Sequence, residues 1–339
     1  MGSRRQVVVA LICCVGLLGG CGKTEPSAAV APGSATEPVR VLSYRPDEVM
    51  EPLLARFTAE TNIPTQLEVR SGEGVVEYFT SPPAGPIPDL IVVVDSQRLA
   101  GIAEAGALRA LPSAALEQIP PQWRDTQGRW LGLSWRLRAV LQPTDGGSVG
   151  YRELTDLVAN GRRVCVRGGD HVYNRGLLTW LAGRDGDEAA QRWAAAVHGA
   201  RQPVEGGDRD QIRALTRGEC DYAVVNHYYL ARMLHETDDL ELRQRLGMLR
   251  FGPKPEHEPS GLYGNLSGIA VTREGGNQAG ADRLALWLAA PANQSAYAAA
   301  VFEFPAAWPD GAGTLPPALD ALKHLRVGPP FPADLGQRR

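Results

Sequence analysis

Three tyrosines of this sequence stand where a strand is expected to lead into a helix. Tyr173 follows the strand-like run 163–167, and the vicinal pair Tyr228 and Tyr229 follows the apolar run 222–225. In open α/β sheets, ligands bind beyond the carboxyl ends of the strands. We therefore expect three phenol oxygens to face one cleft.

A phenol is a poor metal ligand until it loses its proton, because its pKa is near ~10. A trivalent hard cation favours the phenolate by direct coordination, and the positive end of a helix adds to this effect. Hard cations prefer oxygen donors, and three phenolates would neutralise a 3+ charge. The tyrosines therefore suggest a ferric-iron site. The simpler interpretation is that they are packing residues whose rings have one edge exposed to water.

The elements that must position these loops follow from the hydrophobic pattern. Apolar runs alternate with segments of helical spacing from residue 39 onward. We expect strands at 39–43, 65–69, 89–94, 163–167, 222–225 and 266–272, and helices at 49–60, 96–105, 175–183, 187–197, 209–216, 229–235 and 281–288. Repeated strand–helix alternation predicts an α/β fold with a mainly parallel sheet.

Composition excludes several classes of protein. The 339 residues suffice for two ordinary domains with their own cores. The chain is 44% hydrophobic and 22% charged, which is typical of a soluble globular protein and not of a coiled coil or a collagen-like repeat. A net charge of −3 provides no broad basic surface for nucleic acid. Only the extreme N-terminus has an apolar run near membrane length, which excludes several membrane spans.

The N-terminus has the pattern of an export signal. A basic start and an apolar run over 7–18 precede a small-residue stretch that ends in Cys21, and this stretch resembles the lipobox of bacterial lipoproteins. The resemblance implies cleavage of residues 1–20, lipid on Cys21 and an extracytoplasmic, membrane-anchored protein; plain secretion is the alternative. Residues 21–38 are small, polar and Pro-rich, and we expect them to form a flexible tether.

Cysteine usage agrees with export. Of five cysteines, processing would remove Cys13 and Cys14, and lipid would occupy Cys21. Cys165 and Cys220 remain as one pair in an oxidising compartment, where a disulfide is plausible. A bridge over a loop of about 55 residues would contribute on the order of 3–4 kcal/mol. Two buried free thiols are the alternative.

Several stretches of the sequence resemble the ferric-iron-binding proteins of bacterial ABC transporters. Residues 218–230 (GECDYAVVNHYYL) resemble the GECDxAxxNxYYL stretch of that family, and residues 206–212 match its GGDRDQI. Further similar stretches are RVCVR with VYN (163–174), PDLIVVVD with RL (88–99), WLGLS with Arg136 and Arg138 (130–138), and NLSG (265–268). The similarity extends from about residue 39 to about 305.

This resemblance implies a type II periplasmic-binding fold, an α/β fold with two lobes, a hinge and a ligand cleft between the lobes. It implies lobe 1 at 39–137 plus 262–290 and lobe 2 at 138–261 plus 291–325, and we expect a surface tail at 326–339. A monomer is expected. The iron would pass to an inner-membrane ABC permease and its ATPase in other chains, because this chain has no G-x-x-x-x-G-K-[ST] motif.

The resemblance also implies a set of site residues. Tyr173, Tyr228 and Tyr229 would coordinate Fe³⁺, and Cys165 would be bridged to Cys220. His171 and His227 flank the tyrosines in the sequence, and we expect neither of them to be a ligand.

The first loop departs from the family pattern. Members often read YSxRHY there, whereas this chain has Arg45 in the matching place, followed by Pro46 and Asp47 at the His and Tyr positions. Proline cannot bind a metal, but Asp47 is a hard oxygen donor. The alternative is that Asp47 caps the helix expected at 49–60.

Arginines near this loop suggest an anion partner. By resemblance, Arg45 together with Arg136 or Arg138 would hold a carbonate-like synergistic anion through forked hydrogen bonds. The alternative is that these arginines form ion pairs at the surface or the hinge.

Two other functions compete with iron binding. A receptor of the same fold for a phosphonate or another small organic anion is one, because the His and Tyr of the first loop are missing. An exported enzyme is the other. The sequence has no G-x-S-x-G or H-E-x-x-H motif, and no cysteine nucleophile remains if the pair is bridged, so we expect no enzymatic activity.

Overall fold

The structure is a computed structural model that describes residues 37–71, 74–82, 84–252, 261–307 and 319. The predicted signal peptide, Cys21, almost all of the predicted tether and the tail at 326–339 lie outside the described residues. Within the described part of the chain, no helix has both the length and the apolar character needed to span a membrane.

The strands join in the order β2-β1-β3-β9-β5-β7-β6. Their bounds are β1 (Val39–Ser43), β2 (Thr65–Val69), β3 (Leu90–Val93), β4 (Leu108–Arg109), β5 (Trp130–Pro143), β6 (Val164–Val166), β7 (Tyr222–Asn226), β8 (Leu249–Phe251), β9 (Gly264–Thr272) and β10 (Phe304–Pro305). Strands β4 and β9 pair beside this path, as do β8 and β10 with β5.

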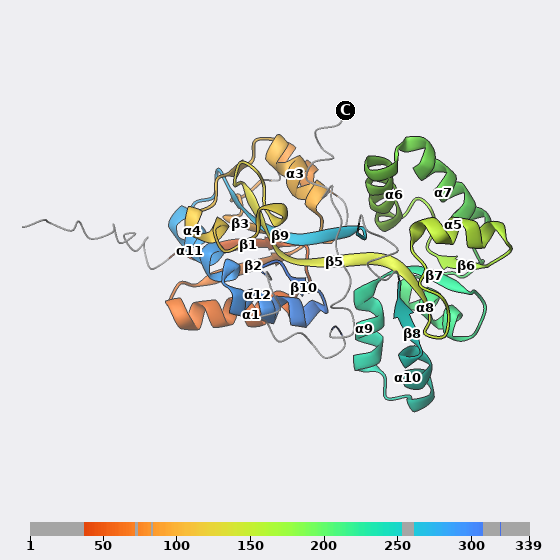
Figure 1. Cartoon of the computed structure of the whole chain (residues 1–339). Helices are drawn as coiled ribbons and strands as arrows, with labels where there is room; N and C mark the ends of the chain where they lie inside the picture. Colours follow the sequence, from red (N-terminus) through yellow and green to blue (C-terminus); the bar gives the residue numbers. More distant parts are fainter. Residues whose placement is uncertain (1–36, 72–73, 83, 253–260, 308–318, 320–339) are drawn as a thin grey trace, which may run out of the picture. The chain divides into compact units, whose positions relative to one another are not determined.

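Helices cover the sheet at both ends of this order (Figure 1). Their bounds are α1 (Asp47–Thr61), α2 (Val75–Thr80), α3 (Ser96–Glu104), α4 (Ser113–Leu116), α5 (Tyr151–Ala159), α6 (Val172–Asp185), α7 (Asp187–Gly199), α8 (Asp208–Thr216), α9 (His227–Glu236), α10 (Leu240–Gly247), α11 (Gln278–Ala289) and α12 (Pro291–Val301). The predicted α/β class is therefore confirmed.

The sheet is mixed, and the prediction of a mainly parallel sheet is wrong. Strand β1 is parallel to β2 and β3, and β6 is parallel to β7. Strand β9 is antiparallel to β3 and β5, and β5 is antiparallel to β7. The antiparallel pairs arise because β5 and β9 carry the chain from one lobe to the other and back again.

Two hydrophobic cores mark the two lobes. One core is built around β1, β3, β9 and the first half of β5, with Phe57 and Trp130 among its fully buried side chains. The other is built around the second half of β5, β6 and β7, with Tyr151 and Trp180 at its centre. In Figure 1, β5 runs from the orange and blue helices of the first lobe to the green helices of the second.

The last described helix packs with the first core. The sequence analysis assigned residues 291–325 to lobe 2, but Tyr297 and Val301 of α12 lie in the core of lobe 1, as do Ala306 and Ala307. Tyr297 is fully buried there, and its hydroxyl accepts a hydrogen bond from Arg45 at 2.9 Å. The returning chain therefore completes lobe 1, although Phe304 and Leu319 contact the second core.

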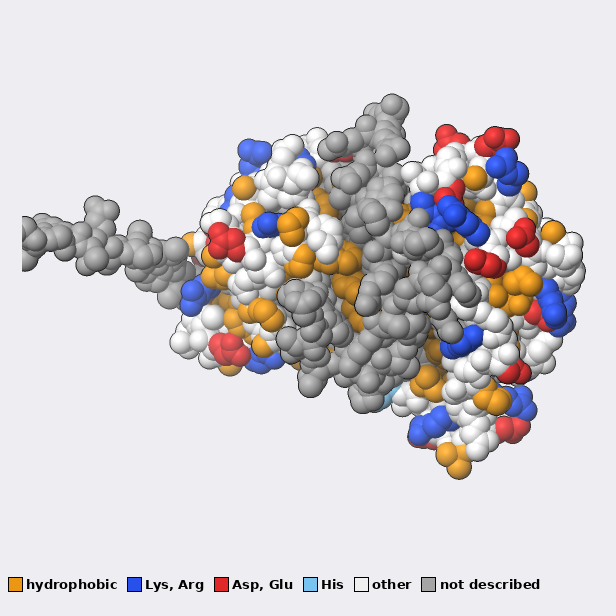
Figure 2. All heavy atoms as spheres, viewed as in Figure 1, with side chains coloured by type: hydrophobic (Ala, Val, Ile, Leu, Met, Phe, Trp, Pro, Cys, Tyr) orange, Lys and Arg blue, Asp and Glu red, His pale blue; other side chains and the backbone are white. Residues whose placement is uncertain are grey.

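Acidic and basic side chains are interspersed over the face of the molecule visible in Figure 2, outside the grey atoms. Exposed pairs on single helices occur among the described residues, such as Arg192 with Glu188 and Arg245 with Glu241. Pairs of this kind stabilise a helix by a few tenths of a kcal/mol (about 0.3–0.5) and do not form a binding surface of one charge.

Candidate metal centre

A cleft with a volume of ≈ 740 Å³ is lined by residues of both lobes. Tyr44, Arg45 and Arg136 line it from the first lobe and β5. Tyr173, Tyr228 and Tyr229 line it from the second lobe. The structure therefore brings all three predicted tyrosines to one cavity.

Two of the tyrosine oxygens are already close together. The hydroxyl oxygens of Tyr173 and Tyr228 lie 3.1 Å apart, although the residues are 55 positions apart in the sequence. The rings of Tyr228 and Tyr229 are adjacent, with their centroids 4.4 Å apart and their planes inclined by 36°. All three side chains are partly exposed to the cleft.

The tyrosines reach the cleft because their strands are neighbours. Strands β6 and β7 are parallel, with Val164 opposite Tyr222, so their carboxyl ends meet at one edge of the sheet. The predicted disulfide is present, since Cys165 of β6 is bonded to Cys220, two residues before β7, with their Cα atoms 5.7 Å apart. This bridge ties together the two strands that lead to the tyrosines.

Each tyrosine lies in the first turn of a helix, not in the loop before it. Helix α6 begins at Val172, and the side chain of His171 caps it by accepting a hydrogen bond from the backbone N–H of Tyr173 at 3.2 Å. Helix α9 begins at His227. The sequence analysis placed the starts of these helices at 175 and 229, later than the structure does. The N-cap residues are His171 and Asn226, and the bulky residues that follow each of them obscured the start of the helix.

The environment of the phenols opposes their ionisation in the absence of a metal. Burial, followed by the neighbouring Tyr173 and Tyr229, holds the pKa of Tyr228 well above its ordinary value, and the charge of Arg136 acts in the opposite direction. Burial and the proximity of Tyr173 also raise the pKa of Tyr229. A cation that enters the cleft would reverse this balance, because it neutralises the charges that burial penalises.

Arg45 and Arg136 belong to one buried network at the hinge. Glu303 forms an ion pair with Arg45 at 2.5 Å. Its carboxylate also accepts hydrogen bonds from the hydroxyl groups of Ser134, at 2.5 Å, and Ser267, at 3.2 Å. Arg136 donates to the carbonyl oxygen of Val94 at 2.6 Å. Arg45 therefore forms the hinge ion pair that was the alternative interpretation of the sequence. Arg45 and Arg136 nevertheless both line the cleft.

Glu303 is charged despite complete burial. Burial alone would raise its pKa, but Arg45 and Arg136 outweigh this effect, and hydrogen bonds from Ser134 and Arg45 help to hold the pKa at about 2. The network therefore fixes one negative charge between two positive ones, on the side of the cleft opposite the tyrosines.

Arg138 has a different environment from the other two arginines. It is 1% exposed, does not line the cleft and forms a 2.9 Å ion pair with the buried Asp208. Asn174 and Asn226 complete its surroundings. It therefore lies behind the tyrosines in the second lobe rather than in the cleft.

In the first loop, Tyr44 lines the cleft and Asp47 does not. Asp47 is exposed and is the first residue of α1, where its carboxylate accepts from the backbone N–H of Glu48 at 3.1 Å. The N-cap is Pro46, so Asp47 does not cap the helix. Sequence reasoning missed Tyr44, although it directly precedes Arg45 and carries the same phenol group as the three predicted ligands.

The two histidines beside the tyrosines have structural roles. His227 is buried, and its Nδ1 accepts the backbone N–H of Leu137 at 3.0 Å. Burial lowers the pKa of His227 to about 4. Among the described residues there is no group of three His, Cys, Asp or Glu side chains that could hold a metal.

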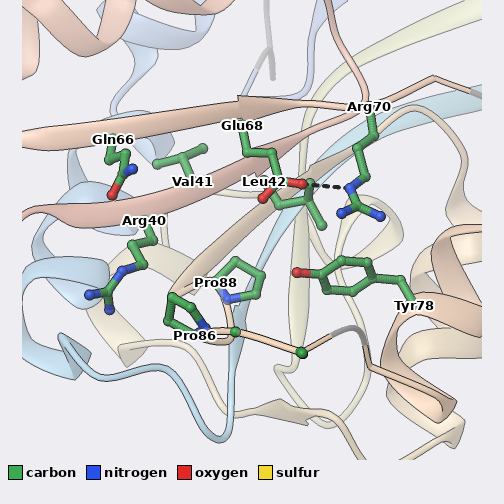
Figure 3. A pocket seen from close by; sticks show the side chains of 11 residues that line it. Arg40, Val41, Leu42, Gln66, Glu68, Arg70, Tyr78, Pro86 and Pro88 are labelled. Atoms are coloured by element: carbon green, nitrogen blue, oxygen red, sulfur yellow. Dashed lines mark hydrogen bonds and ion pairs between the residues drawn. The ribbon is translucent and has the colours of Figure 1, made fainter.

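A second, smaller pocket of ≈ 200 Å³ lies at the β1–β2 edge and is lined by Arg40, Glu68, Arg70 and Tyr78, among others (Figure 3). Arg70 is paired with Glu68 at 2.6 Å and lies over the ring of Tyr78, 4.6 Å from its centroid. Among the described residues that line this pocket, Glu68 is the one carboxylate and is engaged by Arg70, and Tyr78 is the one phenol, so the pocket offers fewer hard oxygen donors than the cleft.

The fold and the cleft define the class of two-lobed periplasmic binding proteins. No family model matches the chain. The chain is 30% identical to iron uptake protein A1 of Synechocystis over 302 residues, which is 85% of this chain and 81% of the relative. The chain belongs to the family of periplasmic ferric-iron-binding proteins, whose named members are iron-binding proteins and not enzymes.

Solved structures agree with this assignment. The Bordetella ferric binding protein superposes with a TM-score of 0.77 at 26% identity, over 88% of this chain and 94% of that one. The Trichodesmium protein IdiA (FutA), solved with iron and citrate, superposes with a TM-score of 0.77 at 25% identity, over 89% of this chain and 95% of that one.

Proposed function

We propose that this protein binds Fe³⁺ in the interlobe cleft through the phenolates of Tyr173, Tyr228 and Tyr229. The observation that carries the proposal is the meeting of these three side chains in one cavity, with two hydroxyl oxygens 3.1 Å apart. An oxygen–oxygen distance of this size suits two donors that share one cation. Membership of the family supports iron as the ligand.

Charge balance favours a trivalent ion. Three phenolates carry three negative charges, and a ferric ion would leave the set neutral within a partly buried cleft. A divalent ion would leave one negative charge beside buried side chains, which is costly in a medium of low dielectric constant. Hard oxygen donors also suit Fe³⁺ in preference to softer metals.

The first lobe would supply the remaining contacts. Arg45 and Arg136 line the cleft, so we assign the synergistic anion, carbonate or a similar small anion, to them. For a fourth protein ligand, Tyr44 is the better placed donor because it lines the cleft, whereas Asp47 is exposed outside it. Substituting each residue in turn distinguishes the two donors.

The protein would deliver its iron to an inner-membrane ABC permease and its ATPase. We propose that lipid on Cys21 anchors it outside the cytoplasm, that residues 21–38 form the tether and that it acts as a monomer. The lipobox-like stretch before Cys21 supports the anchor, and the names of the relatives support a role in iron uptake.

Titration of the purified chain with ferric citrate, followed by visible absorption, tests this function. Phenolate-to-iron charge transfer should produce a visible band that saturates at one iron per chain. Absence of both a band and bound iron, with the disulfide intact, would instead favour a receptor for a phosphonate or another organic anion, held by Arg45 and Arg136.

A further inference from the structure

Arg138 lies in β5 directly behind the tyrosines and is one of the largest fully buried side chains of the protein. Its guanidinium Nη1 donates to Oδ2 of Asp208 at 2.9 Å. Asp208 is fully buried and also accepts the backbone N–H of Asn226 at 2.8 Å. A buried charge pair of this kind is expensive to form and adds little stability compared with apolar packing, so it calls for a functional explanation.

The geometry around Arg138 fixes the orientation of two asparagine amides. A guanidinium has five donors and no acceptor. Its Nε and Nη2 donate to Oδ1 of Asn174 at 3.1 and 2.8 Å, and its Nη1 donates to Oδ1 of Asn226 at 3.3 Å. Both amides must therefore turn their oxygens towards Arg138 and their NH₂ groups away from it.

These NH₂ groups point to the two tyrosine segments. Nδ2 of Asn174 donates to the carbonyl oxygens of Arg167 and Gly168, at 2.9 and 2.8 Å, and so holds the turn that leads into α6 and Tyr173. Nδ2 of Asn226 donates to the hydroxyl oxygen of Tyr228 at 3.3 Å. Through the two asparagines, Arg138 therefore supports the turn before Tyr173 and the hydrogen bond to the hydroxyl oxygen of Tyr228.

We propose that Arg138 is a positioning residue that acts through Asn174 and Asn226 to set the oxygens of Tyr173 and Tyr228 for binding one ferric ion. This inference rests on the proposed function, and it assigns Arg138 to the tyrosines instead of to the synergistic anion. The donor from Asn226 occupies one lone pair of the Tyr228 oxygen and leaves another for the metal. Partners outside the ligand shell typically change metal affinity by about 10–100-fold.

Asp208 gives the network its charge balance. It is the counterion of Arg138 and also lies 4.0 Å from the guanidinium of Arg167, so Arg138 serves as a fork of donors rather than as a free positive charge beside the iron. A glycine at 206 with φ of +94° turns the chain just before α8, where Asp208 is the first residue. A side chain at that position would be strained and would collide with Asp210, so the GGDRDQI motif positions this counterion.

Lysine cannot replace the arginine in this role. An ammonium keeps the charge and the ion pair, but its donors radiate from one atom and cannot hold Asn174 through two bonds while also reaching Asp208 and Asn226. Arg138→Lys therefore separates positioning from charge. Asn226→Ala removes the donor to Tyr228 together with one acceptor for Arg138, and it keeps the Arg138–Asp208 pair.

The test compares these two variants of the full chain with Arg129→Lys. Arg129 forms an ion pair with Asp125 at 2.7 Å in the first lobe, is more exposed than Arg138 and does not line the cleft. Ferric-citrate titration gives the affinity, the charge-transfer band reports the phenolate–iron bond, and thermal unfolding reports stability. We expect Arg138→Lys and Asn226→Ala to lower affinity by about 10–100-fold and to shift the band, and Arg129→Lys to change neither.

The outcomes separate this inference from the proposed function. A wild-type chain that binds no iron refutes the function itself. A wild-type chain that binds iron, with both variants showing its affinity and its band, overturns the positioning role, even if Arg138→Lys unfolds at a lower temperature. If Arg138→Lys does not fold, Asn226→Ala decides alone, since an unshifted band contradicts the proposal.

Discussion

The two sides of the cleft are built in different ways. On the second lobe, the tyrosines stand on the first turns of two helices, above two parallel strands that a disulfide joins. On the first lobe, Arg45 is held by Glu303, while the neighbouring Pro46 and Asp47 are exposed. One side thus presents phenol groups that already lie together, and the other presents a fixed cation beside an open loop.

This difference suggests that the two lobes have different roles in binding. Preorganised ligands bind without a further ordering cost, so the second lobe should determine how tightly iron is held. The first lobe should determine how the hinge responds, because its arginine network connects the first loop, β5, β9 and Glu303, the second residue after α12.

The largest expected effect concerns the charge of Glu303. Glu303→Gln would leave Arg45 and Arg136 without their buried counter-charge, and breaking a buried pair typically costs about 3–5 kcal/mol of folding free energy. Urea unfolding at pH 7 measures this loss. Ser113→Ala, on α4 of the first lobe, serves as the control. An unchanged midpoint for Glu303→Gln would show that the network adds nothing to the hinge.

The acid stability of the wild type offers a second measure of the same charge. The pKa of Glu303 is about 2 in the folded chain, below the ordinary value of about 4.3 for an unfolded glutamate. The unfolded state therefore takes up the proton first, and the stabilisation is lost as pH falls from about 4.3 towards 2. The stability difference between wild type and Glu303→Gln should shrink over that range.

The next effect concerns the disulfide under the tyrosines. Replacing both cysteines, as Cys165→Ser with Cys220→Ser, should cost on the order of 3–4 kcal/mol because the unfolded chain regains the freedom of a loop of about 55 residues. Thermal unfolding measures the loss. If the bridge only stabilises the lobe, the double variant should still bind iron at low temperature. A variant of unchanged stability would contradict the loop-entropy argument.

Substitution of the tyrosines should cost less free energy than the changes above, but it tests iron binding directly. Tyr228→Phe or Tyr173→Phe removes one phenolate and should weaken ferric binding by roughly 100-fold or more, beyond the effect typical of residues outside the ligand shell. The visible band should weaken as well. Tyr222→Phe, at the start of β7 and outside the cleft, is the matched control and should bind as the wild type does.

The smallest effect is expected on the open side of the cleft. Asp47→Ala should change iron affinity by less than about 2-fold, because the carboxylate is exposed and only its own helix terminus uses it. Tyr44→Phe should have the larger effect of the two, since Tyr44 lines the cleft. The reverse order in ferric-citrate titrations would return Asp47 to the ligand set.

The second lobe could be predicted from the sequence more completely than the first. Strands before the tyrosines are short, apolar and followed by helical spacing, so their carboxyl ends could be located from local patterns. The disulfide pair followed from counting the cysteines. By contrast, β5 was not predicted, because arginines at 136 and 138 interrupt its apolar run and both are buried only through partners far away in the sequence.

Long-range partners explain the other differences. Arg138 looked like an anion holder because nothing local shows that Asp208 and two asparagines surround it. Helix α12 was assigned to the wrong core because its contacts with the first lobe cross more than 200 residues of chain, as in the bond from Arg45 to Tyr297. Local spacing carries no information about such contacts.

The path of the chain through the two cores also has a consequence for biogenesis. The second core is formed mainly by one continuous stretch, from Leu137 to Tyr263, whereas the first core needs both the residues before it and the residues that follow, up to Ala307. A polypeptide that emerges from its N-terminus first would hold β3 without its partner β9 until the whole second lobe had appeared. The first lobe is thus synthesised first and completed last. Its unpaired strand edges would need protection during export.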